Sequence, residues 1–231
     1  MTNHAERAKG GWLMAYGDVT TLLICFFIMM MMKNRGEISR VHDWVNQRVD
    51  ETALELRQLV DRESLHTFRV QRESKGVKIT LQGKELFASG RAEVGPVLQK
   101  QLKKVSQLLP QMTIFSVSEQ DKYADFMQLV TNSGMDWTVE IRVEGHTDNQ
   151  PLRLGAKYAN NWLLSAARAS SVMQVLHQQS GMPEKVFSVA GFGEYQPVAE
   201  NDSPQGRERN RRIDIYINAA LMNRKLGGED G

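Results

Sequence analysis

Residues 138–145 read TVEIRVEG, and this stretch decides the fold of the C-terminal part of the chain. Apolar and polar side chains alternate along it, which is the pattern of a β-strand with one buried face. Similar strand patterns occur at residues 76–81, 187–191 and 213–217. The four segments together predict a β-sheet.

Helical patterns separate these strands. Residues 96–109 repeat apolar side chains every three or four positions after a first-turn proline, and residues 157–179 predict a long helix that ends before Gly181. Residues 110–136 fit no strong period and read as an insertion, within which 123–131 are compatible with a short helix. Because helices and strands interleave, we expect an α+β sandwich of βαβαββ-like order.

Composition excludes several classes of function. The 231 residues include 29 Lys and Arg against 27 Asp and Glu, so no strong overall charge favours nucleic acid, and we expect no nucleic-acid partner. The single cysteine, Cys25, excludes an intrachain disulfide. His146 and Asp148 lack a third ligand nearby in sequence, so we expect no metal site. No set of nucleophile, base and orienting residue is evident, so we expect no enzyme.

Residues 12–32, WLMAYGDVTTLLICFFIMMMM, contain one charged side chain, that of Asp18. As a helix they span about 30 Å, the thickness of the hydrocarbon layer of a bilayer, and we predict a transmembrane helix. A cleaved signal peptide is the alternative, since Arg7 and Lys9 precede the run. The run is longer than a usual signal core and lacks a small-residue cleavage site, so we favour a retained anchor.

Asp18 is costly in this position. Inserting an acid near the bilayer centre costs about 2.5–3.5 kcal/mol, and helical spacing places Thr21 on the same face. Such a carboxylate is typical of a proton or cation relay, whereas the alternative is an acid that only holds helices together by hydrogen bonds. A single helix cannot enclose a pathway, so a relay requires a partner with several membrane-spanning helices.

Residues 33–66 predict an amphipathic connector helix. Its apolar positions are Ile38, Val41, Val45, Val49, Leu56 and Leu59. This narrow stripe is a seam for a second copy of the chain or a strip that lies against the membrane or a partner, and a plain spacer helix is an equal alternative.

Four motifs follow one another in the C-terminal part: VEGHTD at 143–148, Asn161 with LSAARA at 164–169, GFGE at 191–194, and GRERNRRI at 206–213. With these motifs, residues 75–218 resemble the OmpA-like peptidoglycan-binding domain. We place that domain at 67–221, followed by a disordered tail at 222–231. Compared with the shortest domains of this family, residues 150–160 are an extra loop beside the implied pocket.

The resemblance implies roles for individual residues. In OmpA-like domains, the aspartate of the GHTD motif and the arginine of the LSxxRA helix bind the ionised ends of the diaminopimelate side chain in the peptidoglycan stem. Asp148 and Arg168 hold these positions. An acid suits an ammonium group and a forked guanidinium suits a carboxylate, so the chemistry agrees. The resemblance adds four further pocket residues: Thr147, Asn161, Leu164 and Arg212.

The N-terminal GWLMAYGD at 11–18 and TLL at 21–23 resemble the membrane segment of MotB/PomB-type B subunits of ion-driven stators. The resemblance implies an ion pathway at Asp18 and Thr21 that carries H⁺ or Na⁺ without a bound cofactor, and torque for flagellar-type motility. It also implies a homodimer surrounded by about five multi-span A subunits and anchored to peptidoglycan, and it makes the connector a candidate plug.

Localisation follows from the same resemblance. Lys33, Arg35 and Arg40 follow the apolar run, and a simple positive-inside count would keep the C-terminus in the cytoplasm. A long domain is translocated largely regardless of such charges, so we expect a bacterial inner-membrane protein with residues 1–11 as a cytoplasmic tail and a periplasmic domain. Two alternatives remain: the same motor parts in a Zorya-type anti-phage complex, and a passive membrane-to-peptidoglycan tether.

Overall fold

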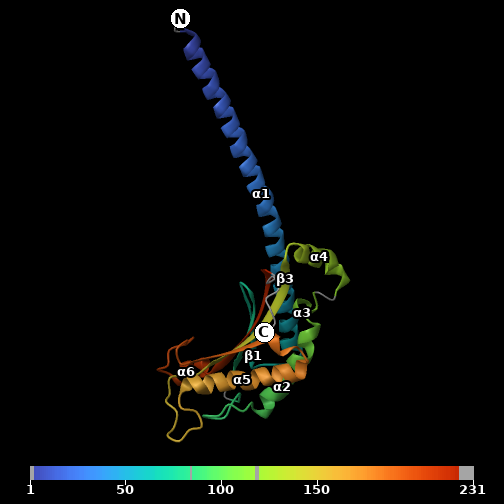
Figure 1. The fold of residues 1–231 in the computed structure, drawn as a ribbon. Helices are drawn as coiled ribbons and strands as arrows, with labels where there is room; N and C mark the ends of the chain where they lie inside the picture. The colour runs from blue at the N-terminus through green and yellow to red at the C-terminus, as the bar shows by residue number, and fades with distance from the viewer. Residues whose placement is uncertain (1–2, 84, 118–119, 224–231) are drawn as a thin grey trace, which may run out of the picture. The chain divides into compact units, whose positions relative to one another are not determined.

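The computed structural model describes residues 3–83, 85–117 and 120–223, and its side chains at 12–32 and, within those ranges, from 43 onward. Two compact units divide the chain, Met1–Val45 and Asn46–Gly231. Helix α1 (Asn3–Arg62) contributes residues to both (Figure 1).

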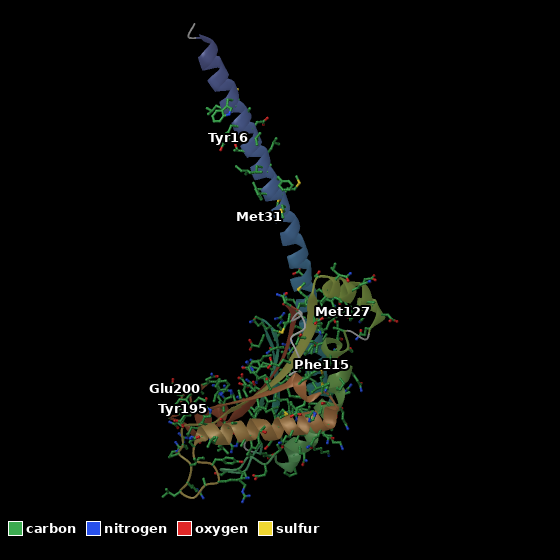
Figure 2. The ribbon with its side chains drawn as sticks, in the orientation of Figure 1. Tyr16, Met31, Phe115, Met127, Tyr195 and Glu200 are labelled. Carbon is green, nitrogen blue, oxygen red and sulfur yellow. The ribbon has the colours of Figure 1, made fainter. Side chains whose placement is uncertain are left out.

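The first unit is helical throughout its described part. The stretch Trp12–Met32 is 21 residues long and has a mean hydropathy of 1.9. Among the described residues it is the one helical stretch long and apolar enough to cross a membrane. Side chains such as Tyr16 and Met31 project from this helix (Figure 2). The exposed fractions of Trp12, Phe26 and Met29 are 67%, 62% and 72%, so this surface needs an apolar environment outside the chain.

The second unit is built on a five-stranded mixed sheet. Its strands are β1 (Phe68–Glu73), β2 (Gly76–Gln82), β3 (Met135–His146), β4 (Phe187–Gly193) and β5 (Arg212–Asn223). The spatial order is β1-β2-β5-β3-β4, with β3 and β4 parallel and the other pairs antiparallel. The four strands predicted from the alternating pattern are therefore confirmed, and the α+β class with them.

Two helices cover one face of the sheet. Helices α2 (Pro96–Leu108) and α5 (Asn161–Ser180) lie side by side in Figure 1, and their apolar side chains share a single buried core with those of β2, β3 and β5. Ile215 of β5 pairs with Ile79 on one side and with Val143 on the other, which places all three on this face. Burial of this continuous apolar layer is the main stabilising contribution to the domain.

Helix α5 begins four residues later than the predicted start at residue 157. The Asn160 side chain accepts a hydrogen bond of 2.9 Å from the backbone N–H of Leu163, which makes Asn160 the N-cap residue. At the other end Gly181 adopts a φ of 68°, a left-handed conformation that terminates helices. The predicted end of the helix agrees with the structure.

Two parts of the sheet were not expected from the sequence. Strand β1, FRVQRE, has four polar residues out of six, so its alternation is too weak to predict a strand. Strand β5 continues through 222 and 223, which we assigned to a disordered tail, because it remains paired with β3 as far as Met135. The rest of that predicted tail, 224–231, lies outside the described residues.

The predicted insertion at 110–136 contains short helices. These are the 3-10 turns η1 (Leu109–Gln111) and η3 (Asp121–Tyr123) with α3 (Thr113–Ser116) and α4 (Ala124–Asn132). Helix α4 agrees with the short helix expected at 123–131. A further short helix, α6 (Pro204–Asn210), precedes β5.

The boundary of the domain differs from the predicted one. Residues 46–62 of α1 bury their apolar stripe in the core of the second unit, where Val49, Ala53, Leu56 and Leu59 are at most 3% exposed. Polar contacts add to this packing: Glu55 accepts a hydrogen bond of 2.6 Å from the Thr113 hydroxyl. The domain therefore begins near Asn46 rather than at residue 67. Over 46–62 the stripe is neither a seam for a second copy nor a strip on the membrane, because the chain's own core covers it.

Candidate functional site

The ends of strands β3 and β4 and the first turns of α5 form the candidate peptidoglycan site. Close packing is possible because Gly145, near the end of β3, has no side chain: a Cβ there would lie 2.0 Å from the carbonyl oxygen of Ser165 in α5. Thr147 and Asp148 follow β3 directly, and Arg168 lies on the second turn of α5. These packed elements, rather than a flexible loop, set the positions of the predicted residues.

Asp148 is nearly buried, with 8% of its surface exposed. Its Oδ2 accepts a hydrogen bond from Nη1 of Arg211 at 2.6 Å, and its Oδ1 accepts one from the backbone N–H of Gln150 at 3.3 Å. The carboxylate is thus held by a charge-assisted hydrogen bond, which is the stronger kind.

Arg168 is also nearly buried, at 7% exposed. Its Nε donates to the carbonyl oxygen of Arg91 at 2.9 Å, and its guanidinium lies 5.0 Å from the ring centre of Phe87. The pKa of Arg168 is lowered to about 10, mainly by burial; the negative charge of Asp148 opposes this shift, and the positive charge of Arg211 adds to it. Arg168 therefore stays positively charged at neutral pH, fixed beside Asp148.

Three other predicted residues have mainly local contacts. The Asn161 amide donates to Oε2 of Glu194 at 2.9 Å and to the carbonyl oxygens of Gln150 and Asp148 at 3.0 and 3.3 Å. The Thr147 hydroxyl donates to the Asp148 carbonyl oxygen at 2.9 Å. Leu164 is 3% exposed and belongs to the buried side of α5. Asn161 thus ties the start of α5 to the segment after Asp148.

Arg211 is a site residue that the sequence analysis missed. We predicted its neighbour Arg212, whose Nε donates to Asp214 at 2.9 Å and whose guanidinium also donates to the carbonyl oxygen of Gln196. Both arginines and Arg168 line one small cavity of about 40 Å³. The GRERNRRI motif contains four arginines, and the only sequence signal for Arg211 was its place beside Arg212; the fold decides which of them contacts Asp148.

A buried polar cluster lies next to this site. His146 is 2% exposed, and its Nε2 lies 3.7 Å from Asp214 Oδ2 and 3.9 Å from Glu144 Oε2. Burial lowers the pKa of His146 to about 4, and the charge of Arg212 acts in the same direction. Burial raises the pKa of Glu144, which Arg142 partly opposes through an ion pair of 2.9 Å. His146 is therefore neutral near neutral pH.

The predicted ion-pathway residues lie in the first unit. The Thr21 hydroxyl donates to the backbone carbonyl oxygen of Asp18 at 2.8 Å, and the Thr20 hydroxyl donates to that of Gly17 at 2.9 Å. Asp18 and Thr21 are both exposed on the helix surface. The carboxylate of Asp18 and the hydroxyl of Thr21 thus lie about one helical turn apart in a predominantly apolar segment.

Family comparisons match both parts of the chain. Residues 86–211 match the model of the OmpA family, and residues 2–37 match the model described as membrane MotB of the proton-channel complex MotA/MotB. Motility protein B of Bacillus subtilis is 31% identical over 157 residues, which cover 68% of this chain and 51% of that protein. The chain therefore spans about half the length of that relative.

Solved structures share the fold. A MotB-like protein from Desulfovibrio vulgaris matches 78% of this chain and 99% of its own with a TM-score of 0.61, at 19% identity. The cell wall anchor of the T6SS from Pseudomonas aeruginosa matches 71% of this chain and 96% of its own, with a TM-score of 0.52 and 30% identity. The chain belongs to the OmpA family, and with its N-terminal MotB segment it is a MotB-type stator B chain with a C-terminal OmpA-like domain.

Proposed function

We propose that this chain is the ion-conducting B subunit of a stator complex, anchored to peptidoglycan and generating torque against a rotor. Protons or sodium ions are its transported species, and a multi-span A subunit surrounds a pair of B chains. The chain spans the inner membrane once, with its N-terminus in the cytoplasm and its OmpA-like domain in the periplasm.

One observation carries the ion-conducting part of this proposal. Asp18 is the single charged residue in the apolar segment Trp12–Met32, and it lies within the match to the MotB membrane model. A passive anchor gains nothing from an acid that costs about 2.5–3.5 kcal/mol to insert near the bilayer centre. Loading and release of an ion would change the charge of Asp18, and with it the contacts that Asp18 prefers with a partner.

Membership of the OmpA family supports the wall-binding part. The diaminopimelate side chain ends in an ammonium and a carboxylate group. Asp148 offers an acceptor for the ammonium group, and Arg168 and Arg211 offer donors for the carboxylate. The site is fixed by α5 and β3, so little ordering would be required on binding.

Ion flux tests this proposal. The tagged chain is purified with its associated subunits from native membranes, reconstituted into vesicles, and given a proton or a sodium gradient. Wild-type complexes should dissipate one of the two gradients, and the Asp18→Asn complex should dissipate neither while inserting normally. Equal flux through the Asp18→Asn complex would overturn the relay, and purification without any multi-span partner would contradict the stator assignment.

A further inference from the structure

A second, larger hollow opens beside the Asp148 site. Its volume is about 580 Å³, and it is lined by the loop after β3, the first residues of α5 and the turn after β4. Small-molecule sites in proteins are typically about 300–1,000 Å³. The loop at 150–160 supplies most of the lining. Of the residues predicted to contact the stem peptide, Asn161 alone lines this hollow.

Two exposed aromatic rings stand at this hollow. The ring centres of Trp162 and Tyr195 are 5.5 Å apart, with their planes tilted by 49°, and the two residues are 51% and 69% exposed. Figure 2 labels Tyr195 and Glu200 at this end of the domain. Aromatic rings with a partly negative face and a polar tip suit ligands that are apolar on one side and polar at the edge.

The fold fixes the two rings in place. Asn160 caps α5 and so sets the position of Trp162. Gly193 has a φ of 55°, and a Cβ there would lie 3.2 Å from the backbone nitrogen of Trp162, so the turn that carries Tyr195 rests directly on the start of α5. The Gly193 N–H also donates to the Ser165 hydroxyl at 2.9 Å. The pair is therefore preorganised, which reduces the entropy cost of binding.

The polar groups at the hollow suit a neutral ligand. Asn161 and Glu194 are joined by their 2.9 Å hydrogen bond, and Arg153 also lines the hollow, so one acid and one base are present together. A pyranose ring presents C–H bonds on its face and hydroxyl and acetamido groups at its edge. The aromatic faces can pack on the C–H bonds of the ring, and the amide and carboxylate groups can hydrogen-bond to its hydroxyl and acetamido groups.

We propose that the hollow at Trp162 and Tyr195 binds an N-acetylated hexosamine ring of the peptidoglycan glycan strand. This rests on the proposed binding of the stem peptide at Asp148 and Arg168. Asn161 connects the two subsites, because its amide contacts the Asp148 carbonyl oxygen on one side and Glu194 on the other. The stem peptide is attached to the sugar in the wall, so two adjacent subsites would bind the peptide and the sugar of one ligand.

Two probes separate the subsites. Calorimetry with the full chain in nanodiscs compares a free diaminopimelate-containing stem tripeptide with the same tripeptide on its N-acetylglucosamine–N-acetylmuramic acid disaccharide. The wild-type chain should bind the disaccharide form about five- to tenfold more tightly, the gain expected for good aromatic contacts. Trp162→Ala and Tyr195→Ala should each remove most of this preference and leave the tripeptide affinity unchanged.

Control variants make the result specific. Tyr195→Phe keeps the ring and should keep the preference, and Leu129→Ala removes a side chain on α4 that is 58% exposed and should change nothing. Equal affinity for both probes in the wild-type chain, or a preference that survives both alanine variants, would overturn the sugar subsite alone. Failure to bind either probe would instead refute the proposed wall-binding function on which the subsite rests.

Discussion

Asp148 and Arg211 form an ion pair of 2.6 Å at the rim of a site that also contains Arg168. An ammonium group that binds Asp148 must share the carboxylate with Arg211 or displace the Arg211 side chain. That side chain is 37% exposed and can move. Arg211 pairs with the Asp148 carboxylate, and Arg168 is close enough for the charge of Asp148 to raise its pKa, so these three groups carry an excess of positive charge. This arrangement favours a ligand that brings a carboxylate together with its ammonium group.

Replacing the acid tests the ammonium half of this recognition. Asp148→Asn keeps the shape but cannot form an ion pair, so we expect it to weaken binding of a diaminopimelate stem peptide by about 2 kcal/mol, roughly 30-fold. Titration calorimetry on the full chain measures this, with Asp125→Asn on α4 as the matched control. Unchanged affinity would exclude Asp148 as a ligand contact.

Arg168→Lys tests the carboxylate half. A lysine keeps the charge and loses the planar fork that binds carboxylates. The wild-type chain should prefer a diaminopimelate peptide over one with lysine in its place, because only the former has the second carboxylate. We expect the variant to lose most of that preference, measured as the ratio of the two dissociation constants. A preserved ratio would place the carboxylate elsewhere, with Arg211 the next candidate.

Much of this site could be predicted from the sequence, because its motifs occur where strands end and a helix begins. The identity of the arginine that contacts Asp148 could not be predicted. Arg211 and Arg212 are adjacent, and only the exit from α6 into β5 sends one to Asp148 and the other to Asp214. The hollow at Trp162 could not be predicted from the sequence either, because most of its lining comes from a loop without a periodic pattern.

The buried histidine should make stability depend on pH. The pKa of His146 is near 4 in the folded chain and near 6.5 when unfolded, so between these values the unfolded chain binds the extra proton. The free energy of unfolding should therefore fall as the pH drops from about 6.5 to 4, by up to about 3 kcal/mol from this group. Glu144 acts in the opposite direction: because its pKa is raised in the folded chain, its ionised form destabilises the fold, and protonation at acidic pH removes this cost.

Denaturant titrations at several pH values check this prediction. The difference in unfolding free energy between the wild-type chain and His146→Gln isolates the histidine, because Glu144 is present in both. That difference should decrease toward acidic pH. A difference that is constant between pH 4 and 7 would show that His146 does not change its protonation on unfolding.

Packing of the connector into the domain predicts a large stability effect. Leu56 is 1% exposed in the core, whereas Leu54 on the same helix is 55% exposed. Leu56→Ala should lower the free energy of unfolding of the domain by about 2–5 kcal/mol, and Leu54→Ala should change it by less than about 0.5 kcal/mol. Equal effects would mean that residues 46–62 are not part of the core.

The surface that covers the connector helix could not be predicted from the sequence. An amphipathic stripe at 33–66 has the same pattern whether it faces a twin chain, a membrane or its own domain, so Val49, Leu56 and Leu59 could not reveal their partner. The partner strands and helices come later in the chain. A plug experiment that deletes residues 36–63 would therefore remove core residues together with any plug, and substitutions confined to residues before Asn46 are the better choice.

Ion flux and wall retention measured on the same preparations test the central claim most directly. Vesicles with the reconstituted complex are assayed for gradient dissipation and for sedimentation with isolated peptidoglycan, using wild type, Asp18→Asn and Asp148→Asn. The account predicts that Asp18→Asn loses flux and keeps sedimentation, and that Asp148→Asn keeps flux and loses sedimentation. Full flux with a neutral side chain at position 18 would contradict it.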